Sequence, residues 1–193
     1  MKGILRTLVL SAALVAAGAW NAQAITMSFD PSHTSVGVGE SFSVDLVVGD
    51  LGGVLISTFD VDVGYDETLL RFDGYTLGDA LGDWAGGGEA WDLSGGDPSG
   101  SGSVNVGELS FLSAAELAPL QSDPLVLATL DFTSLGLGET DLSITLHELG
   151  DENGDPIDAE TFGGTVSVVP EPGTLLLLGS GLLGAAGWRR RVR

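Results

Sequence analysis

The middle of the sequence predicts an all-β domain, flanked by two terminal segments of different composition. Between residues 25 and 169, short runs rich in Val, Ile, Leu, Phe and Thr are separated by turns rich in Gly, Asp, Pro and Ser. This spacing is typical of an all-β sandwich or barrel. Only residues 113–120 have a helix-like composition, and Pro119 limits any helix there to one or two turns. The sequence therefore predicts one β domain at residues 25–169.

Nine runs have the length and composition of strands, and the best of them alternate strictly. In residues 42–46 and 59–63, apolar side chains alternate with Asp45, Asp60 and Asp62. Side chains of a strand point to opposite faces in turn, so one face is expected to be buried and the other solvated. The nine predicted strands cover residues 25–29, 41–48, 55–63, 69–72, 89–93, 103–111, 125–132, 140–147 and 165–169.

The charge of this domain excludes several functions. The 193-residue chain has 27 Asp and Glu, 7 Lys and Arg, and no Cys. Arg71 is the only Lys or Arg between residues 25 and 169, whereas Glu171 is the only acidic residue outside that range. Such a negative field repels phosphate backbones, which excludes nucleic-acid binding. The lack of Cys excludes thiol catalysis and Cys-ligated zinc.

Residues 1–24 have the order of a secretory signal peptide. Lys2 and Arg6 precede an apolar stretch at residues 8–20, and Ala22 and Ala24 then form an A-x-A site. This order of basic, apolar and small residues is the one that signal peptidase recognises. We therefore expect cleavage after Ala24 and export of the chain.

The C-terminal segment, residues 170–193, follows Val169 and combines a short polar motif, an apolar run and a basic end. Val169, Pro170, Glu171 and Pro172 form the motif, and arginines follow the apolar residues 173–188. At about 1.5 Å per residue, a helix of that run would reach roughly 24 Å, short of a ~30 Å hydrocarbon core. We therefore expect only transient insertion into the inner membrane.

In this order, the motif, the apolar run and the arginine cluster resemble the PEP-CTERM sorting signal of Gram-negative bacteria that make exopolysaccharide. The resemblance implies recognition by an exosortase, an integral-membrane cysteine transpeptidase that cuts at or near Pro170, Glu171 and Pro172. It also implies delivery to the cell surface or the extracellular matrix. The alternative is an ordinary C-terminal anchor that follows a Pro-rich linker.

Several motifs of the middle domain resemble the cohesin family. They are residues 59–66, which end in Tyr65 and Asp66, and then residues 107–111, 127–132 and 151–157, in the family's order. The resemblance implies a nine-stranded jelly-roll β-sandwich. Cohesins bind dockerin domains through one sheet face, so a dockerin-like partner is an expectation by analogy only.

The domain has few groups suited to catalysis. It has His33, His147 and one Arg, and it lacks a G-x-S-x-G motif. His147 is next to Glu148 near a strand end, where we expect a hydrogen-bonded surface residue. We therefore expect no enzyme activity. A surface glycosidase, which needs a pair of carboxylates, is the least favoured alternative.

The acidic loop at residues 151–160 is the best candidate for a calcium site. Asp151, Asn153 and Asp155 have the 1, 3, 5 spacing of a calcium loop, and Asp158 adds a further carboxylate. The Gly and Glu expected at positions 6 and 12 of an EF-hand loop are absent. These missing ligands favour the alternative, a polar loop between the last two strands.

Two tryptophans in the middle domain have different expected roles. Trp84, in a Gly-rich loop, is the candidate for stacking against a sugar ring. Trp91 alternates with Ala90 and Asp92 in a predicted strand and is expected in the core. No catalytic residue is assigned.

Together these features favour an exported, non-catalytic protein of the envelope or matrix. We expect it to act as an adhesive or protein-binding, cohesin-like module. The alternative is a calcium-assisted carbohydrate-binding module of the exopolysaccharide matrix, using Trp84.

Overall fold

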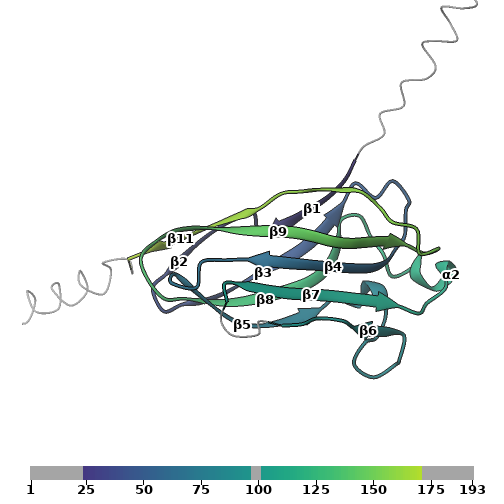
Figure 1. The fold of residues 1–193 in the computed structure, drawn as a ribbon, viewed down its shortest axis with the longest axis horizontal. Helices are drawn as coiled ribbons and strands as arrows, with labels where there is room; N and C mark the ends of the chain where they lie inside the picture. Colours follow the sequence, from purple (N-terminus) through teal and green to yellow (C-terminus); the bar gives the residue numbers. More distant parts are fainter. Residues whose placement is uncertain (1–23, 97–100, 171–193) are drawn as a thin grey trace, which may run out of the picture.

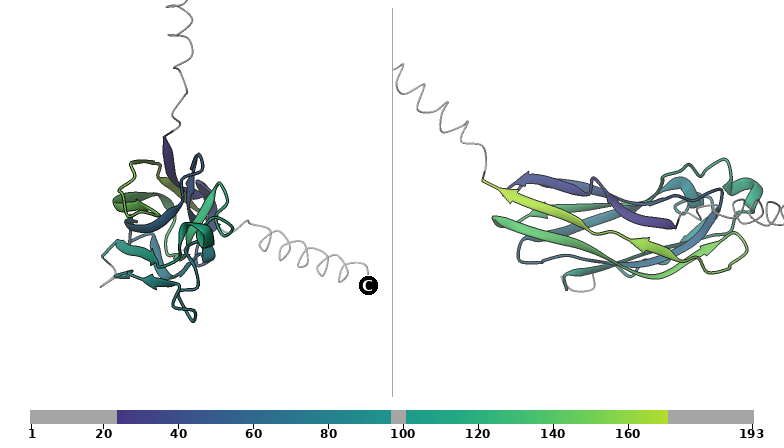
Figure 2. Two further views of the ribbon diagram at one scale, coloured as in Figure 1. Left: turned by 90° about the vertical axis from the view of Figure 1, so that its right-hand side faces the viewer. Right: turned by 90° about the horizontal axis from the view of Figure 1, so that it is seen from above.

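The chain folds into two β-sheets that pack face to face (Figure 1). The structure is a computed structural model and describes residues 24–96 and 101–170. Figure 2 shows the sandwich from two further sides, with both sheets extended along one long axis. Almost all of the regular structure is β, as the sequence predicts.

The described residues form eleven strands and two very short helices. In chain order the elements are β1 (Ile25–Asp30), β2 (His33–Gly37), β3 (Ser41–Gly49), β4 (Ile56–Gly64), β5 (Leu70–Leu77), η1 (Asp79–Leu81), β6 (Ala90–Asp92), β7 (Ser103–Ser110), α2 (Ala114–Leu117), β8 (Leu125–Ser134), β9 (Gly138–Asp151), β10 (Ala159–Thr161) and β11 (Gly164–Val169).

The sheets have five and six strands. The order is β10-β1-β3-β8-β5 in the first sheet and β2-β11-β9-β4-β7-β6 in the second. The strands β1 and β2 follow each other in the chain but belong to different sheets, so the chain crosses the sandwich between them. Most neighbours are antiparallel, whereas β10 pairs with β1 and β2 pairs with β11 in parallel.

All nine predicted strands are present, and the sandwich class is confirmed. The two additional strands, β2 and β10, are short edge strands of five and three residues. The helix-like segment is also short, because α2 ends before Pro119. Its start is stabilised by Glu116, whose carboxylate accepts hydrogen bonds from the Ser113 backbone N–H (2.9 Å) and hydroxyl (2.6 Å).

The core lies between the sheets and is centred on an aromatic cluster. Phe132 on β8 is fully buried, and the rings of Phe42, Tyr65 and Phe72 surround it. Their centroids lie 5.7, 5.4 and 5.6 Å from the Phe132 centroid, in one stacked and two edge-on arrangements. Such aromatic pairs stabilise a core beyond the apolar area that they bury.

Candidate binding face

The outer face of the six-stranded sheet carries both acidic and large apolar exposed side chains. The strict alternation of β4 sends Phe59, Val61 and Val63 into the core, where they are fully buried. Asp60 and Asp62 therefore point outward. We call the outward surface of β9, β4, β7 and β6 the outer face.

An acidic row crosses the middle of the outer face. On β4, Asp60 and Asp62 lie opposite Gly107 and Asn105 of β7. The side-chain Nδ2 of Asn105 donates hydrogen bonds to Asp60 Oδ1 (2.6 Å) and Asp62 Oδ1 (3.1 Å). On the other side, His147 Nε2 of β9 lies 3.0 Å from Asp62 Oδ2. Four side chains from three strands thus form one connected polar row.

The pairing of His147 with Asp62 shifts the pKa values of both groups. The hydrogen bond from His147 lowers the pKa of Asp62, and that from Asn105 adds to this effect. The same bond raises the pKa of His147, as do the charges of Asp62 and Asp60. His147 is thus a hydrogen-bonded surface residue, as expected. With two carboxylates and one imidazole, the row stays net negative once its carboxylates are ionised.

An apolar patch lies beside this row, at the β6–β7 edge of the sheet. Trp91, Leu93 and Phe111 are 61, 45 and 59 % exposed. Trp91 pairs with Leu109 across the two strands, and backbone bonds at Leu93 and Phe111 extend the ladder in both directions. These four side chains therefore share one face, which we call the apolar patch. Clusters of exposed large apolar side chains mark interaction sites.

The expectation that Trp91 belongs to the core is wrong. Ala90 and not Trp91 faces the interior, where it is 5 % exposed. In a strand of only three residues, the alternation of Ala90, Trp91 and Asp92 fits either phase. The register with β7 determines which phase faces the interior, because Ala90 lies opposite the buried Ser110.

Trp84 lies in the loop between η1 and β6 and is 38 % exposed. Asp83 orders the loop around it, because its Oδ1 accepts backbone hydrogen bonds from Ala85 and Gly86, both at 3.0 Å. The ring is thus partly accessible on an ordered turn. A role in sugar stacking stays a prediction.

The acidic loop after β9 is organised by Asp151. Its Oδ1 accepts hydrogen bonds from the backbone N–H groups of Asn153 (2.8 Å) and Asp155 (2.9 Å). These bonds lower the pKa of Asp151, with the Asp155 bond contributing most. Across residues 24–96 and 101–170, no three His, Cys, Asp or Glu side chains converge as a metal site would require. Calcium binding by Asp151, Asn153, Asp155 and Asp158 stays a prediction.

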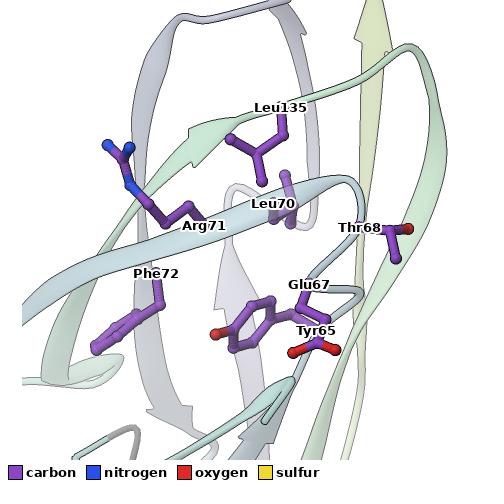
Figure 3. A pocket seen from close by; sticks show the side chains of 7 residues that line it. All are labelled: Tyr65, Glu67, Thr68, Leu70, Arg71, Phe72 and Leu135. Carbon is purple, nitrogen blue, oxygen red and sulfur yellow. The ribbon is translucent and has the colours of Figure 1, made fainter. Parts of the chain in front are cut away.

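A hollow in the described region lies on β5 and the connection that precedes it (Figure 3). It has a volume of about 540 Å³ and is lined by Tyr65, Glu67 and Phe72, among others. The Arg71 guanidinium points away from the rings of Tyr65 and Phe72 and is bonded through Nε to Asp73 Oδ1 at 2.7 Å.

Glu108 on β7 is the residue that sequence reasoning missed. It is fully buried, and neither carboxylate oxygen has a hydrogen-bond partner. Burial, followed by the charges of Asp92 and Asp79, raises its pKa to about 8. The alternation of Val104 and Val106 in the same strand is the signal that could have indicated an inward position for residue 108.

The predicted processing sites lie at the two boundaries of the described chain. Ala24 is exposed immediately before β1. At the other end, Val169 is the last residue of β11 and is 40 % exposed, and Pro170 follows it. Ala22, Glu171 and Pro172 lie outside the described residues, as does the apolar run. Within the described ranges, no helix is both long and apolar enough to span a bilayer.

Comparison with protein families matches residues 168–191 to the PEP-CTERM protein-sorting motif. The chain carries a PEP-CTERM sorting motif. The match begins at the end of β11 and covers the whole polar motif. A PEP-CTERM motif indicates export and processing at the cell envelope through a C-terminal membrane anchor. No curated protein sequence matches this chain.

The sandwich is similar to cohesin modules of known structure. A cohesin from the Clostridium thermocellum Coh-OlpA–Doc918 complex superposes with a TM-score of 0.62 at 12 % identity, covering 76 % of this chain and 100 % of that one. The sixth cohesin of Acetivibrio cellulolyticus scaffoldin B, solved with a Cel5 dockerin, gives 0.60 at 22 % identity, with 76 and 100 % covered. A non-cellulosomal cohesin of Archaeoglobus fulgidus gives 0.57 at 12 %, with 76 and 92 % covered. The fold is cohesin-like.

Proposed function

We propose that this chain is an exported, non-catalytic module that binds a protein partner through the outer face of its six-stranded sheet. The observation that carries the proposal is the apolar patch, with Trp91 61 % exposed at its centre. Binding energy in protein interfaces is concentrated in a few large side chains, and tryptophan is enriched among them. The acidic row of Asp60 and Asp62 adjoins the patch and supplies polar contacts.

The partner is expected to be basic where it meets the acidic row. Arg71 is the only Lys or Arg in the described residues, and the whole chain has a formal net charge of −20. Complementary charge raises association rates and discriminates against acidic competitors. Two of the cohesins of similar fold were solved in complex with dockerins, which supports a dockerin-like module as the class of partner.

Replacing Trp91 with alanine is expected to weaken partner binding by about 2 kcal/mol, or roughly 30-fold, because the patch loses its largest exposed anchor. The measurement is calorimetric titration of the exported chain with a panel of calcium-loaded dockerin modules. Trp84→Ala is the matched control and is expected to leave the affinity unchanged. Equal affinity of wild type and Trp91→Ala for a bound dockerin would reject the outer face as the binding site.

A second candidate function is carbohydrate binding, which the partly exposed ring of Trp84 favours. In that case matrix polysaccharide would retain the wild-type chain, and Trp84→Ala would abolish retention while Trp91→Ala would not. The two tryptophan variants therefore separate the protein-binding and carbohydrate-binding candidates in opposite directions.

We also propose that the exported chain loses both terminal segments. Signal peptidase would cut after Ala24, and an exosortase would cut near Glu171, leaving the described sandwich at the cell surface or in the matrix of a Gram-negative bacterium. Intact-mass analysis of the protein recovered from its native envelope is expected to show neither residues 1–24 nor the terminal arginines. A mass that includes residues 173–193 would contradict exosortase processing.

A further inference from the structure

The side chain of Glu108 is enclosed on every side that the structure describes. In the register of the sheet it lies opposite Asp92 of β6 and opposite the fully buried Phe59 of β4. The short helix η1 packs against β4 and β7, and its Ala80 and Leu81 are buried there. An ionised carboxylate without a hydrogen bond is strongly disfavoured in such surroundings. Glu108 is therefore neutral in the closed sandwich.

The charged and titratable groups around Glu108 offer it no counter-charge. Asp92 faces it from β6 and Asp79 from the start of η1, and both raise its pKa. Tyr75 of β5 donates its hydroxyl hydrogen to Asp92 Oδ2 at 2.9 Å, which holds the Asp92 carboxylate in place. Arg71, the one Lys or Arg of the described chain, is bonded to Asp73 instead. Ionisation of Glu108 would therefore place two carboxylates opposite each other.

The strand β6 is the element best able to relieve that repulsion. It has three residues, forms the edge of its sheet and pairs only with β7. Gly88 precedes it and Gly96 follows it, both with positive φ, so the described backbone turns at a glycine on either side of β6. An edge strand that pairs with one neighbour opens at a lower free-energy cost than a strand inside the sheet. Like charges directly opposite each other in a ladder are destabilising.

We propose that β6 stays paired with β7 while the Glu108 carboxyl is neutral, and that ionisation of Glu108 releases β6 together with Trp91 from the outer face. Release lets water reach the carboxylate and separates it from Asp92. The opening of β6 follows from the repulsion between the Glu108 and Asp92 carboxylates alone. Its effect on partner binding rests, in addition, on the proposed function, because Trp91 and Leu109 face each other across β6 and β7.

The opening can be followed in the full chain labelled with 5-fluorotryptophan, in which Trp91→Phe assigns the signal of Trp91. Between pH 6 and 9.5 the Trp91 fluorine shift is expected to change with a midpoint near pH 8, the pKa of Glu108. Glu108→Gln is expected to remove the transition. Asp92→Asn is expected to move it to lower pH, because one of the two charges that raise the pKa is gone. A Trp91 signal that does not change, or that titrates equally in Glu108→Gln, would overturn the proposal.

Calorimetric titration at pH 6.5 and pH 9 then separates this proposal from the proposed function. Binding that weakens at least tenfold at pH 9 in the wild type, but not in Glu108→Gln, supports both. A Trp91 transition without any dockerin binding supports the release of β6 and counts against the outer face as a dockerin site. Binding through Trp91 that is equally strong at both pH values, without a transition, counts against the release of β6.

Discussion

Replacing Glu108 with glutamine is expected to remove a large loss of stability that the wild-type chain undergoes as the pH rises. In the unfolded chain the carboxyl ionises near its ordinary pKa of 4.5, whereas in the sandwich its pKa is raised to about 8. Between these values the folded state holds a proton that the unfolded state has released. The free energy of unfolding therefore falls as the pH rises through this window and levels off above pH 8.

The full shift of this pKa from 4.5 to about 8 corresponds to about 4 to 5 kcal/mol. The release of β6 limits the loss of stability that is observed, because local opening exposes the carboxylate at a smaller free-energy cost than global unfolding. Urea denaturation of the wild type and Glu108→Gln at pH 5, 7 and 9 measures the difference. At pH 5 the two proteins are expected to be similar, and at pH 9 the variant is expected to be more stable by several kcal/mol.

A matched control is available on the same sheet. Glu148 on β9 is exposed, so Glu148→Gln removes one carboxylate without removing a buried group. Its stability is expected to follow that of the wild type across the pH range. Parallel curves for the wild type and Glu108→Gln would show that Glu108 has no raised pKa in the folded chain.

Replacing Phe132 with alanine is expected to cost about 3 to 5 kcal/mol at any pH. Phe132 is fully buried and contacts three other rings, from Phe42, Tyr65 and Phe72. Truncation removes its apolar surface from the core and leaves a cavity that three strands of one sheet cannot close. The midpoint of urea denaturation at constant m-value measures the loss.

Phe162 provides the control for this change, because it is 47 % exposed and lies after the edge strand β10. Phe162→Ala is expected to change stability by no more than about 0.5 kcal/mol. If Phe132→Ala unfolds the chain, Phe132→Leu retains part of the volume and should give a smaller, measurable loss. A loss in Phe132→Ala no larger than that in Phe162→Ala would mean that the aromatic cluster is not the centre of the core.

The long strands could be predicted because each carries its own periodicity. In β4, four alternations of apolar and acidic residues identify both the strand and its buried face. The segments His33–Gly37 and Ala159–Thr161 carry no such pattern, since β2 has one buried valine and β10 has three residues. They are strands because parallel neighbours distant in sequence supply their backbone partners. Val166 is one such partner for β2, and Met27 is one for β10.

The candidate site was harder to predict, because it depends on register. Asp60, Asn105 and His147 come from three strands separated by more than forty residues, and only the pairing of those strands brings them into one row. Trp91 shows the limit of periodicity, since three residues do not define a phase. Glu108 shows the reverse case. Its alternation with Val106 places it on the inward face, although carboxylates are rarely buried in proteins.

The two parallel pairings at the ends of the chain also determine how the sandwich bears a mechanical load. The last strand, β11, lies between β9 and β2, antiparallel to one and parallel to the other. The chain enters the sandwich toward one end and leaves it at the other (Figures 1 and 2). Tension applied at Val169 therefore runs along β11 and is shared by both rows of its hydrogen bonds at once. Under such tension we expect β11 to shear as a unit, because both rows of hydrogen bonds carry the load together.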